Sequence, residues 1–186
     1  VDVDRAMVDR YGLRKFVKMA WAQVEPGVYL SNWHVDLICE HLEAVQNLEI
    51  RNLLIEIPPG GMKSLLVAVF YPAWVWIKDP GHKFLYATYA QDLSNRDAKR
   101  HRDLVASPWF QARWGHRCSI GADQVQRVEV FETAQHGFRF STSVGGIATG
   151  RHADTKVSDD LNKAQDAMTG STDAFDKAFD FQTKTM

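Results

Sequence analysis

The sequence is poor in cysteine and lacks an apolar run long enough for a membrane helix. Its two cysteines, Cys39 and Cys118, form no paired motif, which excludes a disulfide-rich framework and indicates ordinary reduced thiols. The seven histidines are scattered, and none stands at metal-ligand spacing with a second histidine or a cysteine, so we expect no structural zinc site. The longest apolar run, residues 65–77, is interrupted by Pro72 and is shorter than the roughly 20 residues that span a bilayer as a helix.

Neither sign of charge is in excess, since the formal net charge of the 186 residues is −1. Hydrophobic residues make up 45% and aromatic residues 11%, which is enough for the core of one ordinary domain and argues against extensive disorder. Near-neutral charge does not exclude nucleic acid as a partner, because lysine and arginine can cluster on one face. No basic, apolar and small-residue signal segment opens the chain, which argues against secretion.

Helical and strand-like patterns alternate along the chain. The pattern predicts a short amphipathic helix over residues 1–20, helices over residues 31–47 (capped by Ser31) and 63–76, and a strongly charged helix over residues 92–106. Apolar runs and period-two alternation predict strands over residues 52–57, 83–88, 126–131, 137–141 and 155–158. The alternation predicts an α/β fold with a mainly parallel central sheet flanked by helices. We expect residues 1–30 to be an N-terminal helical extension and residues 31–186 to form the domain itself.

The turn after residue 57 has the features of a phosphate-binding loop. Ligands of parallel sheets bind beyond the carboxyl ends of the strands, and this turn connects a predicted strand to a predicted helix. Gly60 and Gly61 would let successive backbone N–H groups converge on phosphate oxygens, and the helix that follows adds its positive end. Lys63 can reach the β- and γ-phosphates, and the Ser64 hydroxyl can ligate Mg²⁺.

The loop departs from the usual pattern for such a turn, G-x-x-x-x-G-K-[ST]. That pattern requires glycine at positions 57 and 62, where this chain has Ile57 and Met62, and only Lys63-Ser64 matches strictly. A plain turn rich in proline and glycine, followed by a capped helix, is therefore an alternative at this point.

Two adjacent carboxylates end another predicted strand. Asp159 and Asp160 lie about 95 residues beyond Lys63, a common separation in phosphate-loop ATPases. Beside such a loop, the first carboxylate would hold Mg²⁺ and the second would orient and deprotonate the attacking water. The strand is polar for a buried one, with Lys156 and Ser158, so a surface turn with two acids is the alternative. The two motifs together, in this order, favour a nucleotide-hydrolysing site.

A series of short motifs follows along roughly residues 30–186. They are WH from Trp33, CEHL from Cys39, PPGGMKSLL from Pro58, FYPAW from Phe70, TYA from Thr88, RD from Arg96, SPWFQARWG from Ser107, SVGG from Ser143, TGR from Thr149 and DD from Asp159. As an ordered set they resemble the large terminase subunit of tailed bacteriophages, one branch of which uses a similar Pro-Pro-Gly-x-Met-Lys-Ser loop.

The resemblance implies the ATPase domain of a viral DNA-packaging motor, a P-loop NTPase of the ASCE or RecA-like type that uses ATP and Mg²⁺. It implies double-stranded DNA, contacted through its phosphates, as cargo. The implied partners are the portal protein, the small terminase subunit and further copies of the chain in a ring on the portal, in the host cell cytoplasm. Family members also carry a C-terminal RNase H-like nuclease. This chain is too short for both, so we expect an ATPase domain without nuclease, and the completeness of its C-terminus stays open.

The resemblance also assigns roles to individual residues. Lys63 and Asp160 are expected to be catalytic, together with Arg151 as an arginine finger that stabilises charge on the transferring phosphate. The metal is expected on Ser64 and Asp159. The residues expected to bind the nucleotide are Pro59, Gly60, Gly61, Met62, Lys63, Ser64 and Leu65.

For several other residues the sequence allows both a functional role and a structural one. Arg151 lies in a glycine-flanked loop, where an ordinary surface arginine is the alternative to a finger. Arg96 is a weaker finger candidate, because with Lys99, Arg100 and Arg102 it suits a solvated helix face or a face for DNA phosphates. Trp33 and His34 lie where the family places its adenine-side contacts, with helix packing as the alternative. The tryptophans expected in the core are Trp74, Trp76, Trp109 and Trp114.

Two other functions remain open from the sequence. One is a helicase-like P-loop ATPase that acts on nucleic acid. The other is a truncated or degenerate prophage fragment that binds ATP without hydrolysing it. Nucleotide titration and turnover separate the second from an active motor, and strand-unwinding activity identifies the first.

Overall fold

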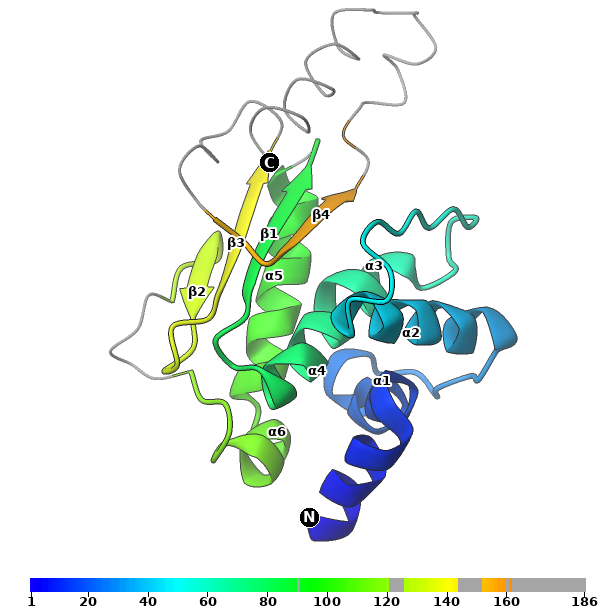
Figure 1. Ribbon diagram of the computed structural model, residues 1–186, viewed down its shortest axis with the longest axis vertical. Helices are drawn as coiled ribbons and strands as arrows, with labels where there is room; N and C mark the ends of the chain where they lie inside the picture. The colour runs from blue at the N-terminus through cyan, green and yellow to red at the C-terminus, as the bar shows by residue number, and fades with distance from the viewer. Residues whose placement is uncertain (90, 121–125, 144–151, 160, 162–186) are drawn as a thin grey trace, which may run out of the picture.

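The computed structural model describes residues 1–89, 91–120, 126–143, 152–159 and 161 (Figure 1). Its elements, in chain order, are α1 (Asp2–Val24), α2 (Trp33–Gln46), α3 (Lys63–Leu65), the π-helix η1 (Leu66–Phe70), α4 (Tyr71–Lys78), β1 (Lys83–Thr88), α5 (Gln91–Ala106), α6 (Pro108–Trp114), β2 (Val130–Glu132), β3 (Phe138–Ser143) and β4 (Thr155–Asp159).

The sheet has four strands in the order β2-β3-β1-β4. The apolar strand β1 lies between β3 and β4 and runs parallel to both, and β2 is antiparallel to β3. The prediction of an α/β fold with a mainly parallel sheet flanked by helices is confirmed. The predicted strand over 126–131 is shorter than expected, because only Val130–Glu132 pairs with β3 as a strand and Gln126 makes one isolated bridge to Phe131.

The main core lies between the sheet and the helices that Figure 1 shows behind it. Trp76 on α4 packs edge-on against Phe84 of β1 and Phe131 of β2, with ring centroids 6.2 and 5.7 Å apart. Trp74, Trp76 and Trp114 are fully buried and Trp109 packs against the same core, so the core prediction for these tryptophans is confirmed. A smaller apolar cluster around Leu85 and Ala87, residues that alternate with the core-facing ones on β1, covers the sheet's other face.

Helix α1 shares this core and bends at Gly12. Gly12 has φ +66, a left-handed conformation that suits glycine, and the next amide, of Leu13, donates to Glu43 Oε1 of α2 at 2.8 Å. Beyond the bend, Phe16 contacts Phe110 and Trp114 of α6 edge-on. The predicted N-terminal extension therefore packs into the body of the domain through its aromatic face.

The helix predicted over 63–76 is present, extends to Lys78 and contains one irregular turn. Residues Lys63–Leu65 and Tyr71–Lys78 are α-helical, and Leu66–Phe70 between them form a π-helical turn. Pro72 lacks the amide hydrogen that a regular helix would use, so it interrupts the ladder of hydrogen bonds just after this turn.

Two local predictions from the sequence are wrong. Residues 52–57, predicted as a strand, are not part of the sheet. Among the described residues the sheet contains only β2, β3, β1 and β4, and no ladder joins the segment to β4. The period-two pattern remains, since Leu53, Ile55 and Ile57 pack against the core while Leu54 is 81% exposed. Helix α2 begins at Trp33 with Asn32, not Ser31, at the cap position, and Asn32 makes no side-chain capping bond.

Candidate functional site

The loop before α3 is a tight turn with two residues in the left-handed region. Gly60 has φ +85 and Met62 has φ +66, and the Gly61 amide donates to the Pro58 carbonyl at 3.2 Å. A Cβ on Gly61 would lie 2.6 Å from Ile57 Cδ1, so a larger residue there would require the Ile57 side chain to shift. Met62 is the N-cap residue of α3, which places the N–H groups of the first helical turn at the end of this loop.

The loop's basic and hydroxyl side chains meet the end of β4. Lys63 Nζ lies 2.9 Å from Asp159 Oδ1, and the Ser64 hydroxyl donates to Asp159 Oδ2 at 3.5 Å. Figure 1 shows the corresponding arrangement, with α3 beside the carboxyl end of β4. The side chains of Lys63 and Asp159 are each about a third exposed, so solvent and solutes reach the pair. The structure thus brings together three residues that the sequence predicted to share one site.

These residues have the chemistry that a metal–phosphate group requires. A serine hydroxyl and an aspartate carboxylate supply the hard oxygen ligands that Mg²⁺ takes, and Mg²⁺ keeps several waters and phosphate oxygens besides one or two protein ligands. Among the described residues no group of three or more His, Cys, Asp and Glu side chains is gathered as a metal site. The hydroxyl and the carboxylate fit Mg²⁺ that takes its remaining ligands from phosphate and water.

The other residues predicted to bind the nucleotide divide into two groups. Pro59 and Gly60 are exposed at the tip of the turn. Met62 and Leu65 are partly buried, and their side chains pack against the main core. For these two positions, the side chain anchors the loop and the amide is the group left for a ligand.

Two predicted catalytic residues lie outside the described residues. These are Asp160, the second acid of the pair, and Arg151, the finger candidate. Arg96, the weaker finger candidate, is on α5 with half of its side chain exposed, and its Nε lies 2.8 Å from Asp97 Oδ1. Hydrogen bonding and proximity to Asp97 raise the pKa of the Arg96 guanidinium above its usual value, so it remains charged at every accessible pH.

Trp33 and His34 lie side by side at the start of α2. Trp33 is 74% exposed, and its ring meets that of His34 edge-on with centroids 6.1 Å apart. Burial of Trp33 by helix packing, one of the two alternatives, is therefore wrong. The exposed indole has a free face on which a flat ring can stack.

Sequence reasoning missed two buried polar residues that contact the helical turn after the phosphate loop, Tyr86 on β1 and Arg139 on β3. Arg139 is 1% exposed, and its guanidinium lies 3.9 Å above the ring of Tyr86. The available signal was the alternation Phe138-Arg139-Phe140, which places an arginine on the opposite face of the strand from two phenylalanines. Since Phe138 and Phe140 are only partly buried, the arginine faces the core.

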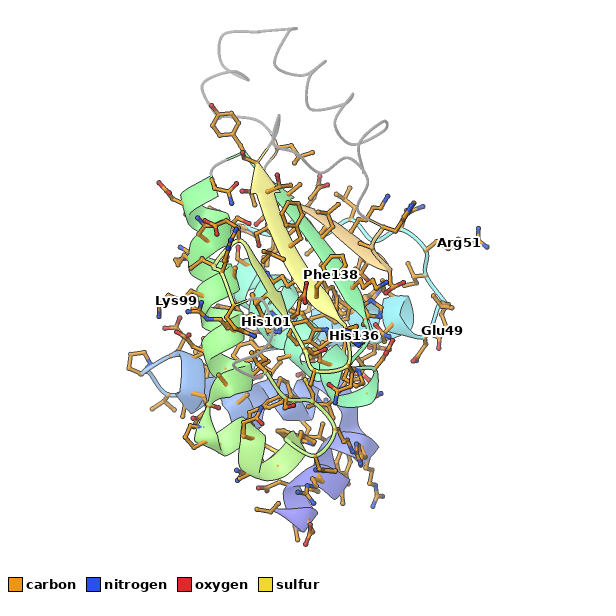
Figure 2. The ribbon with its side chains drawn as sticks, turned by 90° about the vertical axis from the view of Figure 1, so that its left-hand side faces the viewer. Glu49, Arg51, Lys99, His101, His136 and Phe138 are labelled. Atoms are coloured by element: carbon orange, nitrogen blue, oxygen red, sulfur yellow. The ribbon has the colours of Figure 1, made fainter. Side chains whose placement is uncertain are left out.

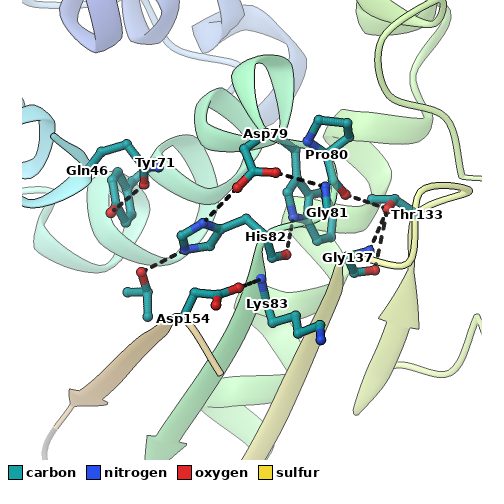
Figure 3. A network of polar contacts seen from close by, with 12 residues as sticks. Gln46, Tyr71, Asp79, Pro80, Gly81, His82, Lys83, Thr133, Gly137 and Asp154 are labelled. Atoms are coloured by element: carbon teal, nitrogen blue, oxygen red, sulfur yellow. Dashed lines mark hydrogen bonds and ion pairs between the residues drawn. The ribbon is translucent and has the colours of Figure 1, made fainter. Parts of the chain in front are cut away.

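A second polar network joins the amino ends of the strands, far along β1 from the phosphate loop (Figure 3). His82 Nδ1 lies 3.4 Å from Asp79 Oδ2, and its Nε2 lies 2.9 Å from Thr155 Oγ1. The Lys83 amide donates to Asp154 Oδ2 at 2.9 Å. These contacts tie the start of β4 to the turn before β1, and they explain how a strand as polar as β4 holds its register.

Two surface hollows lie against α1, and neither is lined by Lys63, Ser64 or Asp159. The smaller, about 300 Å³, collects the cations Arg14, Lys15 and Lys18. Arg14 is paired there with Asp36 at 3.4 Å. These hollows are thus separate from the site at the end of β4.

Comparison of the chain with known protein families, with curated proteins and with solved structures found no match. Within the described part of the chain, none of the helices combines the length and the apolar character that a membrane span needs.

Proposed function

We propose that the chain is a P-loop ATPase of the ASCE or RecA-like type, and specifically the ATPase domain of a viral DNA-packaging motor. The observation that carries the ATPase proposal is the meeting of Lys63 and Ser64 with Asp159, across 95 residues of sequence between the serine and the aspartate. A lysine and a hydroxyl at a helix start after a tight turn, facing a carboxylate at the end of a strand, are groups that bind a triphosphate with its cation. An ordinary surface turn would not require Lys63, Ser64 and Asp159 to lie together.

In this proposal each side chain has one task. Lys63 and the amides of residues 60–65 hold the phosphates by charge and by hydrogen bonds. Ser64 and Asp159 would hold Mg²⁺, which when bound neutralises charge on the phosphate oxygens. Asp160 follows Asp159 directly and takes the proton of the attacking water, with no covalent intermediate. Arg151 is the proposed finger, and it acts on the nucleotide of a neighbouring copy in a ring.

The motor part of the proposal rests on the ordered motifs of the sequence. A translocating motor contacts the DNA backbone, which requires basic side chains and no base-reading element. Portal protein, small terminase subunit and further copies of the chain are the proposed partners, and the host cytoplasm is the proposed location. Because the finger comes from a neighbour, we expect slow turnover by the isolated chain and faster turnover on assembly.

The test is ATP binding and turnover by the wild-type chain and two variants. Lys63→Ala should weaken binding of Mg²⁺–ATP by about tenfold or more, since it removes a charge-assisted contact to phosphate. Asp160→Asn should leave binding in place and abolish turnover. Lys99→Ala is the matched control, because Lys99 is an exposed lysine on α5 that is paired only with Asp103 among the contacts of the described residues.

Each outcome separates the functions that the sequence left open. Unchanged binding in Lys63→Ala would refute the phosphate site. Tight binding without turnover, even in the assembled ring, would support the non-hydrolysing fragment. Turnover that is coupled to strand separation, and not to movement along an intact duplex, would support the helicase-like alternative.

A further inference from the structure

The helix that follows the phosphate loop is wound irregularly, and its sequence explains why. In a regular α-helix the amide of residue 72 would donate to the Ala68 carbonyl, but Pro72 has no N–H and its ring crowds that carbonyl. The chain responds with the π-helical turn Leu66–Phe70, in which the Tyr71 amide donates to the Leu66 carbonyl, five residues back. Such turns are rare and often mark functional positions.

Two side chains of the sheet supply the donors that this turn lacks. The guanidinium Nη1 of Arg139 donates to the Ala68 carbonyl, the one that Pro72 leaves without its usual donor. The hydroxyl of Tyr86 donates to the neighbouring Val67 carbonyl at 2.9 Å. Both residues lie on the helix-facing side of adjacent strands, and Arg139 also approaches Ser141 Oγ at 3.4 Å.

Burial of the Arg139 guanidinium costs desolvation free energy, so core packing alone does not explain an arginine at this position. Arg139 is 1% exposed, and burial lowers the pKa of its guanidinium to about 10, against the opposing influence of Tyr86 and Asp97. An apolar side chain of similar volume would usually be as stable or more stable in a core. What an apolar side chain could not do is satisfy the Ala68 carbonyl of the π-helical turn.

The turn controls where the phosphate-binding side chains point. Lys63 and Ser64 lie on the helical turn that runs directly into it. A shift of one residue in helical register rotates everything before it by about 100° and moves it by about 1.5 Å. Rewinding of Leu66–Phe70 to a regular α-helix would therefore turn Lys63 and Ser64 away from Asp159.

We infer that Arg139 and Tyr86 are positioning residues for the phosphate loop: hydrogen bonds from the sheet to the Val67 and Ala68 carbonyls hold the π-helical turn, and the turn holds Lys63 and Ser64 opposite Asp159. The inference rests on the proposed nucleotide site. Neither residue touches the nucleotide in this arrangement, so both act through the helix.

The first experiment compares two tyrosines that lose the same atom. Tyr86→Phe removes the donor to Val67, whereas Tyr71→Phe removes a hydroxyl on the adjoining helix that donates to Gln46 Oε1 at 3.3 Å. We expect Tyr86→Phe to weaken Mg²⁺–ATP affinity by about three- to tenfold, the range of one lost hydrogen bond, and to speed amide exchange over residues 63–70. Tyr71→Phe should leave both unchanged. Equal ATP affinities in the two variants would overturn the positioning role.

The second experiment measures the stability of the folded chain in the absence of nucleotide. Pro72→Ala restores an amide that can donate to the Ala68 carbonyl, so Arg139→Met should lower the unfolding midpoint less in the Pro72→Ala background than in the wild type. Additive effects of Pro72→Ala and Arg139→Met would overturn the inference. A wild-type chain that binds no nucleotide would overturn the proposed function as well. If the wild type binds nucleotide but the effects of Pro72→Ala and Arg139→Met are additive, only the positioning role is overturned.

Discussion

Lys63 Nζ lies 2.9 Å from Asp159 Oδ1, so the side chain proposed to bind phosphate and the side chain proposed to ligate the metal are paired with each other. A phosphate that draws Lys63 away leaves the Asp159 carboxylate open to a cation. A cation on Asp159 releases Lys63 for phosphate. Binding of nucleotide and of Mg²⁺ should therefore be coupled, each raising the affinity for the other.

Asp159→Asn tests this coupling, because it removes the charge that holds Lys63. In EDTA we expect ATP to bind the variant about two- to fivefold more tightly, since a pair exposed by about a third contributes at most about 1 kcal/mol. Addition of Mg²⁺ should no longer raise the affinity. Calorimetric titration with and without Mg²⁺ measures both effects, and Asp103→Asn on the exposed face of α5 is the control. Weaker binding of metal-free ATP by Asp159→Asn would contradict the prediction.

Gly137 is predicted to tolerate no side chain. A Cβ there would overlap the Pro80 carbonyl oxygen and lie 2.9 Å from that of His82, in the crowded turn that Figure 3 shows. Because both neighbours are backbone atoms, Gly137→Ala should lower the free energy of unfolding by about 1–3 kcal/mol. Gly27→Ala, whose Cβ would meet nothing within 4 Å, should change it by less than about 0.5 kcal/mol. Denaturant unfolding of the two variants provides the comparison.

His101 should make the fold sensitive to acid. It is fully buried on the face of α5 that points toward the sheet, opposite to Lys99 (Figure 2), and neither ring nitrogen has a hydrogen-bond partner among the described residues. Burial, and secondarily the charge of Arg139, lower its pKa well below the usual value. At low pH the unfolded chain then binds a proton that the folded chain does not. The contribution of His101 to the free energy of unfolding is therefore fully present above about pH 6.5, and the free energy falls at lower pH by up to about 1.4 kcal/mol per pH unit.

Replacement of this histidine by an aromatic ring should remove that slope. His101→Phe keeps the contacts with Trp76 and Phe131, whose ring centroids lie 4.6 and 5.2 Å away. The difference between its free energy of unfolding and that of the wild type, measured from pH 5 to pH 8, should grow toward acid. His136→Asn is the control, because His136 is exposed and asparagine accepts its φ of +64. Parallel curves for the wild type and His101→Phe would exclude the assignment.

Both thiols should be unreactive in the folded chain. Cys39 and Cys118 are fully buried, and burial raises the pKa of each to about 12. Because the thiolate is the reactive form, a thiol reagent at pH 8 should label neither cysteine until denaturant is added, and then both. Absorbance after addition of the reagent measures this. Rapid labelling of the folded chain would show that α2 or the segment after α6 opens locally.

The sequence predicted the elements whose pattern is local. β1 contains an apolar run between Lys83 and Thr88, α2 lies where apolar residues recur at helical spacing, and α5 is a strongly charged helical segment, so their existence followed without knowledge of their neighbours. The segment 52–57 has the alternation of a strand but no ladder with β4. Alternation reports which side of a segment is buried, and it does not report whether a partner strand bonds to its edge.

Residue type and order alone singled out Lys63, Ser64 and Asp159 as partners for a phosphate and its cation, because only a few side chains carry that chemistry. Their approach, and the hydrogen bonds from Arg139 and Tyr86 to the π-helical turn after the loop, came only with the tertiary structure. The π-helical turn shows why. Pro72 weakens the helix from within the sequence, but the bonds that satisfy the freed carbonyls come from strands that pack against it only after the chain has folded.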